Sequence, residues 1–209
     1  MLRLALRQRL RHPFTKAAVV LLSLLPFAYL CVSVFLDKLG PNPAESLIRS
    51  SGDWTLRFLC ITLLITPLRM TTQWPEWLLF RRSLGLLTFF YACVHALCYS
   101  LFDMSLDWAE IAKDIGKRPF IAVGLASFVL LILLAITSFN AAVKAMGAAR
   151  WRQLHRAVYG IAVLAILHFF WMRATKRNFA EVWVYASLLG ALLGWRLFHF
   201  TKRSLWKVS

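Results

Sequence analysis

Acidic residues are scarce in this sequence, and so are the motifs that mark the common soluble enzymes. Only nine of its 209 residues are Asp or Glu, whereas 25 are Lys or Arg, which gives a formal net charge of +16. The sequence contains no GxGxxG and no GxxxxGK, the glycine-rich patterns that bind dinucleotides and nucleoside triphosphates. We therefore find no nucleotide site of these common kinds.

Cysteines in a metal-binding or redox spacing are also lacking. Cys31, Cys60, Cys93 and Cys98 all lie inside apolar runs and form no CxxC pair. Free cysteine is among the most buried residue types and behaves as a small hydrophobic residue. We interpret all four cysteines in this way, and the sequence indicates no cysteine-based centre.

The basic excess does not indicate a nucleic-acid-binding protein, because no basic module interleaved with stacking aromatic residues stands between the apolar runs. The sequence is instead rich in apolar residues, with 60% of them hydrophobic and a mean hydropathy of +0.63. This composition is typical of a membrane protein. In such proteins Lys and Arg set the orientation of the chain in the lipid bilayer.

The apolar runs predict an all-α membrane protein, a bundle of six transmembrane helices. Each run is long enough to cross a hydrocarbon core of about 30 Å. We interpret the first as an uncleaved span bent at Pro26, because it is too long for a signal peptide and lacks a small-residue cleavage site. The predicted spans are residues 17–36, 53–68, 83–102, 119–139, 150–172 and 182–200.

The segments between these runs are short and polar. Residues 37–52 are rich in Pro, Gly and polar side chains and are predicted to form a loop, whereas residues 107–116 are expected to form a short interfacial helix. No connection is long enough for a soluble domain. The chain is therefore divided into a basic N-terminus (1–16), a transmembrane domain (17–200) and a short tail (201–209).

Basic residues gather on one side of the predicted membrane. The N-terminal segment, the connectors 69–82 and 140–156, and the C-terminal end from Arg196 hold most of the Lys and Arg but only one acid, Glu76. By the positive-inside rule this side is cytoplasmic. We therefore expect both termini in the cytoplasm and the other connectors on the opposite side.

Three histidines lie within the apolar spans. His95 is in the third span, and His155 and His168 are in the fifth. Ionisable residues inside a membrane are costly and suggest a function. A helix rise of about 1.5 Å per residue places His95 and His168 at similar depth in the outer half of the membrane, so they are predicted to bind one haem iron from opposite faces. Two axial imidazoles suit single-electron transfer.

The third histidine, His155, lies about one turn inside the cytoplasmic boundary and is a candidate ligand for a second, inner haem iron. No fourth histidine stands opposite it, since the matching positions on the third span are arginines. Four arginines near this ring are candidates to pair with haem propionates, because guanidinium groups suit carboxylates. They are Arg81, Arg82, Arg152 and Arg156, for which positive-inside anchoring is the alternative role.

One geometric difficulty concerns the fifth span. On a straight helix, the 13 residues from His155 to His168 leave the second ring about 140° away from the first. A distortion near Gly160, or haems offset around the bundle axis, is needed for both to face the same interior. Arg81 and His95 nearly coincide in azimuth, so Arg81 is the better candidate to face an inner haem.

Several segments together resemble one protein family. They are GPNP with the following SSGDWTLRFL, LLITPLR at 63–69, RRSLGL at 81–86 with HALCY at 95–99, KRPFIAVG at 117–124, and RWRQLHRAVYGIAVLAILHFFW at 150–171. Over nearly its whole length the chain resembles the MsrQ (YedZ-type) haem-binding membrane subunits of bacterial MsrPQ methionine sulfoxide reductase systems. That family is similar to the ferric reductase-like transmembrane domain of NADPH oxidases and ferric reductases.

The resemblance implies haem b bound by His95, His155 and His168, together with FMN. It implies electrons taken from the respiratory quinone pool or from a cytoplasmic flavin reductase. They would pass to the periplasmic molybdopterin enzyme MsrP, which reduces methionine sulfoxide in oxidised periplasmic proteins. The chain would then be an electron-transfer subunit of the bacterial inner membrane that does not itself act on the sulfoxide. At Arg81 and Arg82 it departs from the oxidases, which have a fourth histidine there.

Two other functions are compatible with these residues. One is a ferric or other metal reductase, a b-type cytochrome on the same scaffold. The other is a haem-free small transporter or proton relay that uses the histidines without metal. Transporters often carry internal repeats, and this sequence shows no convincing one, which favours electron transfer.

Overall fold

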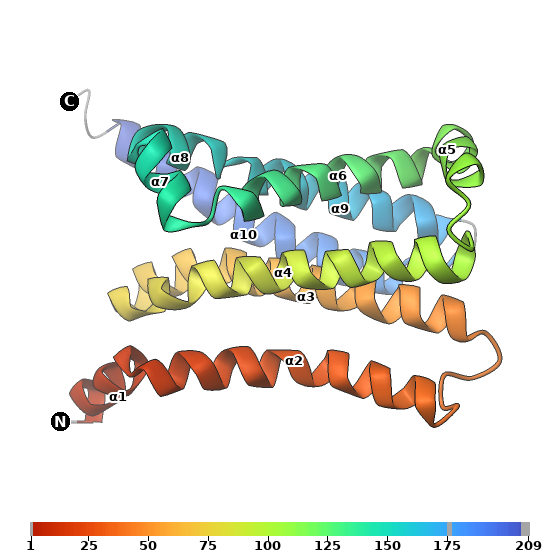
Figure 1. Ribbon diagram of the computed structural model, residues 1–209. Helices are drawn as coiled ribbons and strands as arrows, with labels where there is room; N and C mark the ends of the chain where they lie inside the picture. Colours follow the sequence, from red (N-terminus) through yellow and green to blue (C-terminus); the bar gives the residue numbers. More distant parts are fainter. Residues whose placement is uncertain (1, 175–176, 206–209) are drawn as a thin grey trace.

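In the computed structural model, which describes residues 2–174 and 177–205, all regular structure of the described residues is helical (Figure 1). The all-α class is therefore confirmed. The long helices are α2 (Pro13–Phe35), α3 (Pro43–Thr72), α4 (Leu78–Cys98), α6 (Pro119–Ile136), α9 (Ala157–Ala174) and α10 (Ala180–Leu205). The short ones are α1 (Leu2–Arg11), η1 (Pro75–Trp77), η2 (Tyr99–Asp103), α5 (Trp108–Lys117), α7 (Asn140–Met146) and α8 (Ala148–Leu154).

Four helical segments within the described residues are long and apolar enough to cross a membrane. They are Pro13–Phe35, Pro75–Asp103, Pro119–Ile136 and Ala148–Ala174. They cover all of the third and fifth predicted spans and most of the first and fourth. The second and sixth predicted spans lie in α3 and α10, which have 30 and 26 residues but are less apolar. A bundle of six spans therefore stays a prediction.

The polar stretch 37–52 is a loop only in its first part, because α3 begins at Pro43. The Asn42 side chain caps this helix by accepting a hydrogen bond from the Glu45 backbone N–H at 3.1 Å, and proline is common at the first helical position. The loop prediction was therefore wrong from Pro43 onward. Gly52 lies inside α3, one face of which packs against α4.

The predicted fifth span is also not one straight helix. It consists of α8 and α9, separated by a turn at His155 and Arg156. The break lies before Gly160, where a distortion was expected, and Gly160 itself is an ordinary helical residue of α9. Because the regular helix is interrupted at this turn, the azimuth estimate for a straight helix does not apply to His155 and His168.

Helix α2 lies along the outside of the bundle, next to α4 and α3 (Figure 1). Pro26 falls within it, and proline cannot donate the regular helical hydrogen bond. The buried Tyr91 hydroxyl of α4 donates to the Ser23 carbonyl at 2.7 Å and accepts from the Phe27 backbone N–H at 3.2 Å. Side chains inserted in this way accompany helix bends, so Tyr91 fastens α2 to α4 where proline weakens it.

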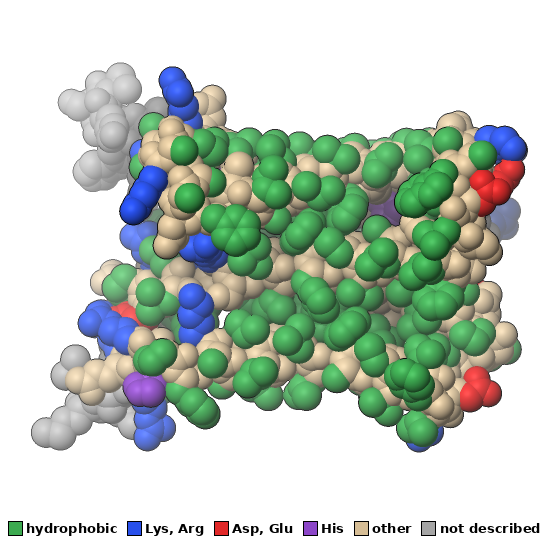
Figure 2. Space-filling view, viewed as in Figure 1, with side chains coloured by type: hydrophobic (Ala, Val, Ile, Leu, Met, Phe, Trp, Pro, Cys, Tyr) green, Lys and Arg blue, Asp and Glu red, His purple; other side chains and the backbone are tan. Residues whose placement is uncertain are grey.

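Charge is distributed unequally between the two ends of the bundle (Figure 2). Basic side chains gather at the end that carries α1, α7, α8 and the last turns of α10, which we call the basic end (Figures 1 and 2). Acidic side chains gather mainly at the opposite end, next to α5, which we call the α5 end. The buried acid at the basic end, Glu76, is paired with Arg7 at 3.1 Å and with Arg11 at 2.7 Å, which ties α1 to η1.

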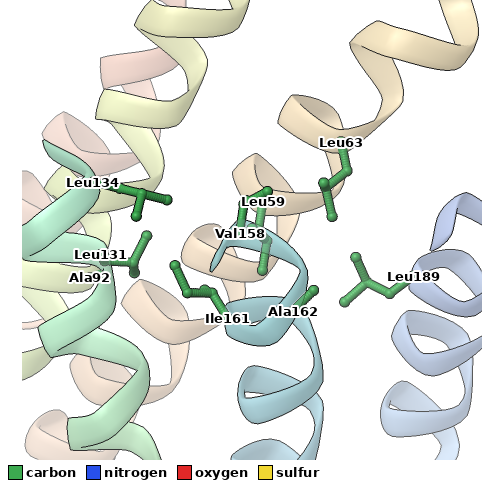
Figure 3. Packing of buried hydrophobic residues seen from close by; sticks show 9 residues of the cluster. All are labelled: Leu59, Leu63, Ala92, Leu131, Leu134, Val158, Ile161, Ala162 and Leu189. Carbon is green, nitrogen blue, oxygen red and sulfur yellow. The ribbon is translucent and has the colours of Figure 1, made fainter. Parts of the chain in front are cut away.

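The middle of the bundle is filled by apolar side chains from α3, α4, α6, α9 and α10 (Figure 3). The cluster consists of Leu59, Leu63, Ala92, Leu131, Leu134, Val158, Ile161, Ala162 and Leu189. In a lipid bilayer such side chains hold helices together by van der Waals packing, because the lipid tails are as apolar as leucine. The pair His95 and His168 lies toward one end of this central cluster, and the single His155 lies toward the other.

Candidate functional site

Helices α4 and α9 bring His95 and His168 together in the half of the bundle nearer the α5 end. The centres of the two rings are 6.1 Å apart, and their planes stand at 86°. Both side chains are partly buried. We call these two residues and the backbone around them the paired-histidine site.

The spacing of the two rings fits one metal ion held between them. Metal–imidazole bonds are about 2.0–2.1 Å long, so two such bonds plus the two ring radii give roughly 6 Å between ring centres. The described residues contain no group of three or more His, Cys, Asp or Glu that would hold a metal ion by themselves. A haem iron needs only two axial ligands from the protein, and the paired histidines can supply both.

Each ring of this site is hydrogen-bonded to a backbone carbonyl of a neighbouring helix. His95 Nδ1 lies 2.8 Å from the Ile48 carbonyl oxygen of α3, and His168 Nδ1 lies 2.7 Å from the Phe120 carbonyl oxygen of α6. A carbonyl only accepts, so both bonds require the proton on Nδ1. The Nε2 atoms then keep their lone pairs for a metal, as in most histidine metal sites.

Each ring also lies directly against a glycine. A Cβ atom added at Gly52 would stand 3.1 Å from His95 Nδ1, and one added at Gly124 would stand 2.7 Å from His168 Nδ1. The second of these distances is shorter than van der Waals contact permits. The two histidines therefore pack against bare backbone. The histidines were predicted from the sequence, but these glycines were not: Gly124 interrupts an apolar run, whereas Gly52 lies in a polar stretch that was predicted to be a loop.

A second site lies nearer the basic end. A cavity of about 400 Å³ opens there between α3, α4, α6, α8 and α9, and His155, Arg81 and Arg82 are among the residues that line it. We call it the His155 cavity. It shares Leu59 and several other wall residues with the central apolar cluster. His155 is the only histidine in its lining.

His155 is held differently from the paired histidines. Its Nε2 atom lies 3.2 Å from the Thr137 hydroxyl oxygen, and its ring stacks on Trp151 with the ring centres 4.0 Å apart. The Trp151 indole N–H in turn donates to the Thr137 carbonyl at 2.8 Å. The nitrogen that the paired histidines leave free is thus engaged here, by a residue that the sequence analysis missed.

The four predicted arginines differ in their surroundings. Arg81 is partly buried, lines the His155 cavity and has no hydrogen bond or ion pair with the described part of the chain. Arg82 also lines the cavity but is exposed, and it donates to the Asn140 side-chain oxygen at 2.7 Å. Arg152 and Arg156 are exposed and are not among the lining residues.

A fifth arginine, which the sequence analysis did not propose for the site, lies beside this cavity. Arg196 of α10 donates to the Tyr159 hydroxyl at 2.9 Å and to the Leu63 carbonyl, and its Nε atom is buried without a partner. It is close enough to Arg81 for the two charges to repel. Its signal in the sequence is a charged side chain directly after the apolar run GALLGW, inside the sixth predicted span.

Polar side chains also meet at the α5 end, between α3, α9 and α10. The buried Arg173 donates to Glu181, and Arg49 pairs with the same carboxylate at 3.2 Å. Arg57 donates to the Tyr185 hydroxyl at 3.2 Å. These bonds join the three helices next to the paired-histidine site and were not predicted.

This chain matches a known protein family and several individual relatives. The model of the ferric reductase like transmembrane component family matches residues 51–166. The chain is 56% identical to a protein of Polaromonas naphthalenivorans over 96% of this chain and 91% of that relative. It is 50% identical to a protein of Herminiimonas arsenicoxydans (88% and 84% covered) and 52% identical to one of Ralstonia nicotianae (87% and 84% covered). All three are named protein-methionine-sulfoxide reductase heme-binding subunit MsrQ.

Proposed function

Because this chain belongs to the ferric reductase-like transmembrane family, and within it to the MsrQ group, we propose that it is the membrane electron-transfer subunit of a protein-methionine-sulfoxide reductase. The observation that carries this proposal is the pair of imidazole rings with centres 6.1 Å apart. Both rings have Nδ1 bound to a carbonyl and Nε2 left for a metal.

We assign His95 and His168 as the two residues that would hold one haem iron. A haem b held there would supply reversible one-electron chemistry, and two imidazole ligands would leave no open position for oxygen. The carbonyls of Ile48 and Phe120 orient the two rings and fix their tautomer. The apolar residues of the central cluster exclude water from the interior of the bundle.

We assign His155 as the ligand of an inner haem iron, in the His155 cavity. Binding through Nε2 requires the Thr137 hydroxyl to give up its contact with that atom. Arg81 and Arg82 line the cavity and are the nearest of the four predicted arginines to any haem carboxylates within it. For the exposed Arg152 and Arg156 a propionate contact stays a prediction. FMN is part of the proposal because of the family resemblance, without an assigned site.

The proposed setting is the bacterial inner membrane, with six spans and both termini in the cytoplasm. The gathering of Lys and Arg at the basic end supports this orientation through the positive-inside rule (Figure 2). The α5 end would then face the periplasm and the catalytic partner MsrP. The electron donor at the basic end would be the quinone pool or a cytoplasmic flavin reductase.

The test uses the full-length chain, expressed with ample haem and purified in detergent. We expect a Soret band and, on reduction, the split visible bands of a low-spin b-type haem, with haem content measured as pyridine haemochrome. His95→Ala and His168→Ala should each remove most of the low-spin haem. His199→Ala is a matched control, because His199 Nδ1 also lies 2.9 Å from a carbonyl but in another part of the bundle. Wild-type absorbance in both ligand variants would refute the assignment.

A metal reductase is the second candidate, favoured by the description of the matching family as ferric reductase like. The dithionite-reduced chain, freed of excess reductant, distinguishes the two functions under anaerobic conditions. For the subunit proposed here, reoxidation by the purified partner MsrP with methionine sulfoxide should be much faster than reoxidation by a ferric chelate. The reverse order would favour the metal reductase.

A further inference from the structure

The two paired histidines are held by two copies of the same local arrangement. In α3, the carbonyl that bonds His95 belongs to Ile48, and Gly52 follows it by four residues. In α6, the carbonyl that bonds His168 belongs to Phe120, and a glycine again follows by four residues. The chain distances also match, since His95 follows its glycine by 43 residues and His168 follows its own by 44.

The four-residue spacing has a physical reason. A helix carbonyl at position i accepts the backbone N–H of residue i+4 and keeps a second lone pair. In an α-helix every Cα–Cβ bond tilts toward the N-terminus, so the side chain at i+4 lies over the turn that contains the carbonyl of residue i. A glycine at i+4 therefore uncovers that second lone pair. A donor from a neighbouring helix can then reach the carbonyl.

We infer that Gly52 and Gly124 are positioning residues, which expose the Ile48 and Phe120 carbonyls and thereby set the ring planes of the two iron-binding histidines. The inference rests on the proposed function, because it takes His95 as an axial ligand together with its partner ring. The two glycines act from the side of each ring that faces away from a metal.

The geometry predicts unequal roles for the two glycines. At Gly124 the added Cβ would stand 2.7 Å from His168 Nδ1 and 2.9 Å from Cε1, so the ring must move. At Gly52 both corresponding distances to His95 are 3.1 Å, which a displacement of a few tenths of an ångström relieves. Alanine at Gly124 should therefore disturb its ring more than alanine at Gly52.

The ring planes have a spectroscopic signature that helix packing alone would not change. The planes of the paired rings stand at 86°, and near-perpendicular axial imidazoles give ferric haem a highly anisotropic low-spin electron paramagnetic resonance signal. Its largest g value lies well above that of a haem whose imidazole planes are parallel. A rotation of either ring therefore shifts this g value even when the haem remains bound.

The experiment compares Gly52→Ala and Gly124→Ala in the purified, full-length haem protein. Gly160→Ala and Gly190→Ala are matched controls, because both glycines are helical and no atom lies within 4 Å of their added Cβ. We expect Gly124→Ala to lose most of the perpendicular signal, by a shift of its largest g value or by loss of haem. Gly52→Ala should shift the same g value less and keep its haem, and the controls should match the wild type.

Two results would overturn the inference. One is an unchanged signal and haem content in both Gly52→Ala and Gly124→Ala. The other is a change in Gly160→Ala or Gly190→Ala as large as in Gly124→Ala, which would indicate a general effect on helix packing. Gly52→Ala keeps the test decisive if Gly124→Ala does not fold. A wild-type protein without haem would instead refute the proposed function, so the two failures are distinguishable.

Discussion

His95 and His168 approach each other from two helices, and each donates a hydrogen bond to a backbone carbonyl of a neighbouring helix. His155, in contrast, is the single histidine of a cavity of about 400 Å³. The paired rings have both Nδ1 atoms bonded to carbonyls, and their centres are 6.1 Å apart, a spacing that fits one metal between them. The Nε2 atom of His155 contacts Thr137 instead. A site whose ligands are oriented before binding loses less free energy on binding than one that must rearrange.

The two sites also differ in charge. Among the described residues, no arginine is hydrogen-bonded to either paired histidine. The direct partners of the two rings are backbone carbonyls and the Ser51 hydroxyl. The His155 cavity is lined by Arg81 and Arg82 and flanked by Arg196. Under the proposed function, the paired site would select a metal by its two imidazole ligands, whereas the arginines of the His155 cavity would bind the acidic groups of a haem.

The largest expected effect comes from removing one histidine of each site. His95→Ala should abolish most low-spin haem absorbance, because the opposite imidazole is then the only protein ligand. His155→Ala should leave the spectrum of the paired site in place and remove only the inner haem. Reduced-minus-oxidised spectra of the two variants measure this difference. Equal losses in both would show that the sites are not independent.

The next effect separates the two cavity arginines. Arg81→Gln should weaken haem binding at the inner site by roughly tenfold to a hundredfold, because hydrogen bonds to charged groups contribute about 1.5–3 kcal/mol. Arg82→Gln should change it less, since Arg82 is exposed and already bonds Asn140. Haem titration of the apoprotein, followed at the Soret band, gives both affinities. A larger loss in Arg82→Gln would contradict the assignment of Arg81.

A smaller effect of opposite sign is expected at Thr137. Thr137→Val removes the hydroxyl that competes for His155 Nε2, so inner-site affinity should rise about two- to tenfold, in line with about 0.5–1.5 kcal/mol for one hydrogen bond. Thr62→Val is the matched control, because Thr62 lines the same cavity and contacts Thr88 instead of His155. The same Soret titration measures both variants. Weaker binding in Thr137→Val would show that the hydroxyl supports the ligand.

The smallest effect concerns α5, which adjoins the paired site. Burial raises the pKa of Asp114, but hydrogen bonds from Arg118 and Tyr99 outweigh it and hold this pKa below its usual 3.8. The contribution of the ionised Asp114 carboxylate to the stability of the fold is therefore complete above about pH 4, and it is lost as the pH falls through the lowered pKa of this group. Asp114→Asn removes the charged partner of Arg118 and should therefore loosen α5 at neutral pH. The Arg118 guanidinium also lies 5.7 Å from the centre of the Phe120 ring, which connects α5 to the paired-histidine site.

Amide hydrogen exchange of residues 108–117 measures that loosening. The wild type should show uniform protection in α5 from pH 8 to pH 5 once the intrinsic exchange rate is corrected, whereas Asp114→Asn should lose protection at both values. Lys113→Gln is the control, because Lys113 pairs with Glu110 on the exposed side of the same helix. A loss of wild-type protection already at pH 6 would contradict the assigned role of the carboxylate.

Part of the site followed from local patterns, and part did not. Hydropathy predicted the helices that carry His95 and His168, because a lipid-facing run needs no knowledge of its neighbours. The loop predicted for residues 37–52 was wrong from Pro43 onward for a general reason. The stretch 37–52 contains proline and glycine, which end helices in many contexts, yet Pro43 begins α3 and Gly52 lies inside it. No property of either residue alone distinguishes these roles.

The repeated arrangement around the two paired histidines was likewise not recognisable in the sequence. No repeat was convincing in the sequence, and the repeated unit consists of a carbonyl, a glycine four residues later and a histidine on the next packed helix. Two of these three parts carry no distinctive side chain. The turn at His155 and the approach of Arg196 to Arg81 were hidden for the same reason, since both depend on how distant helices pack.

The amino-acid sequence alone determined the all-helical class, the apolar spans, the unequal charge of the two ends and the identity of three histidines, because these depend on composition and on distances along one helix. Only the tertiary structure decided which carbonyl holds each ring, which glycine makes room for it and which histidine stands alone. These contacts join helices that are remote in the chain, and their geometry depends on packing to a few tenths of an ångström.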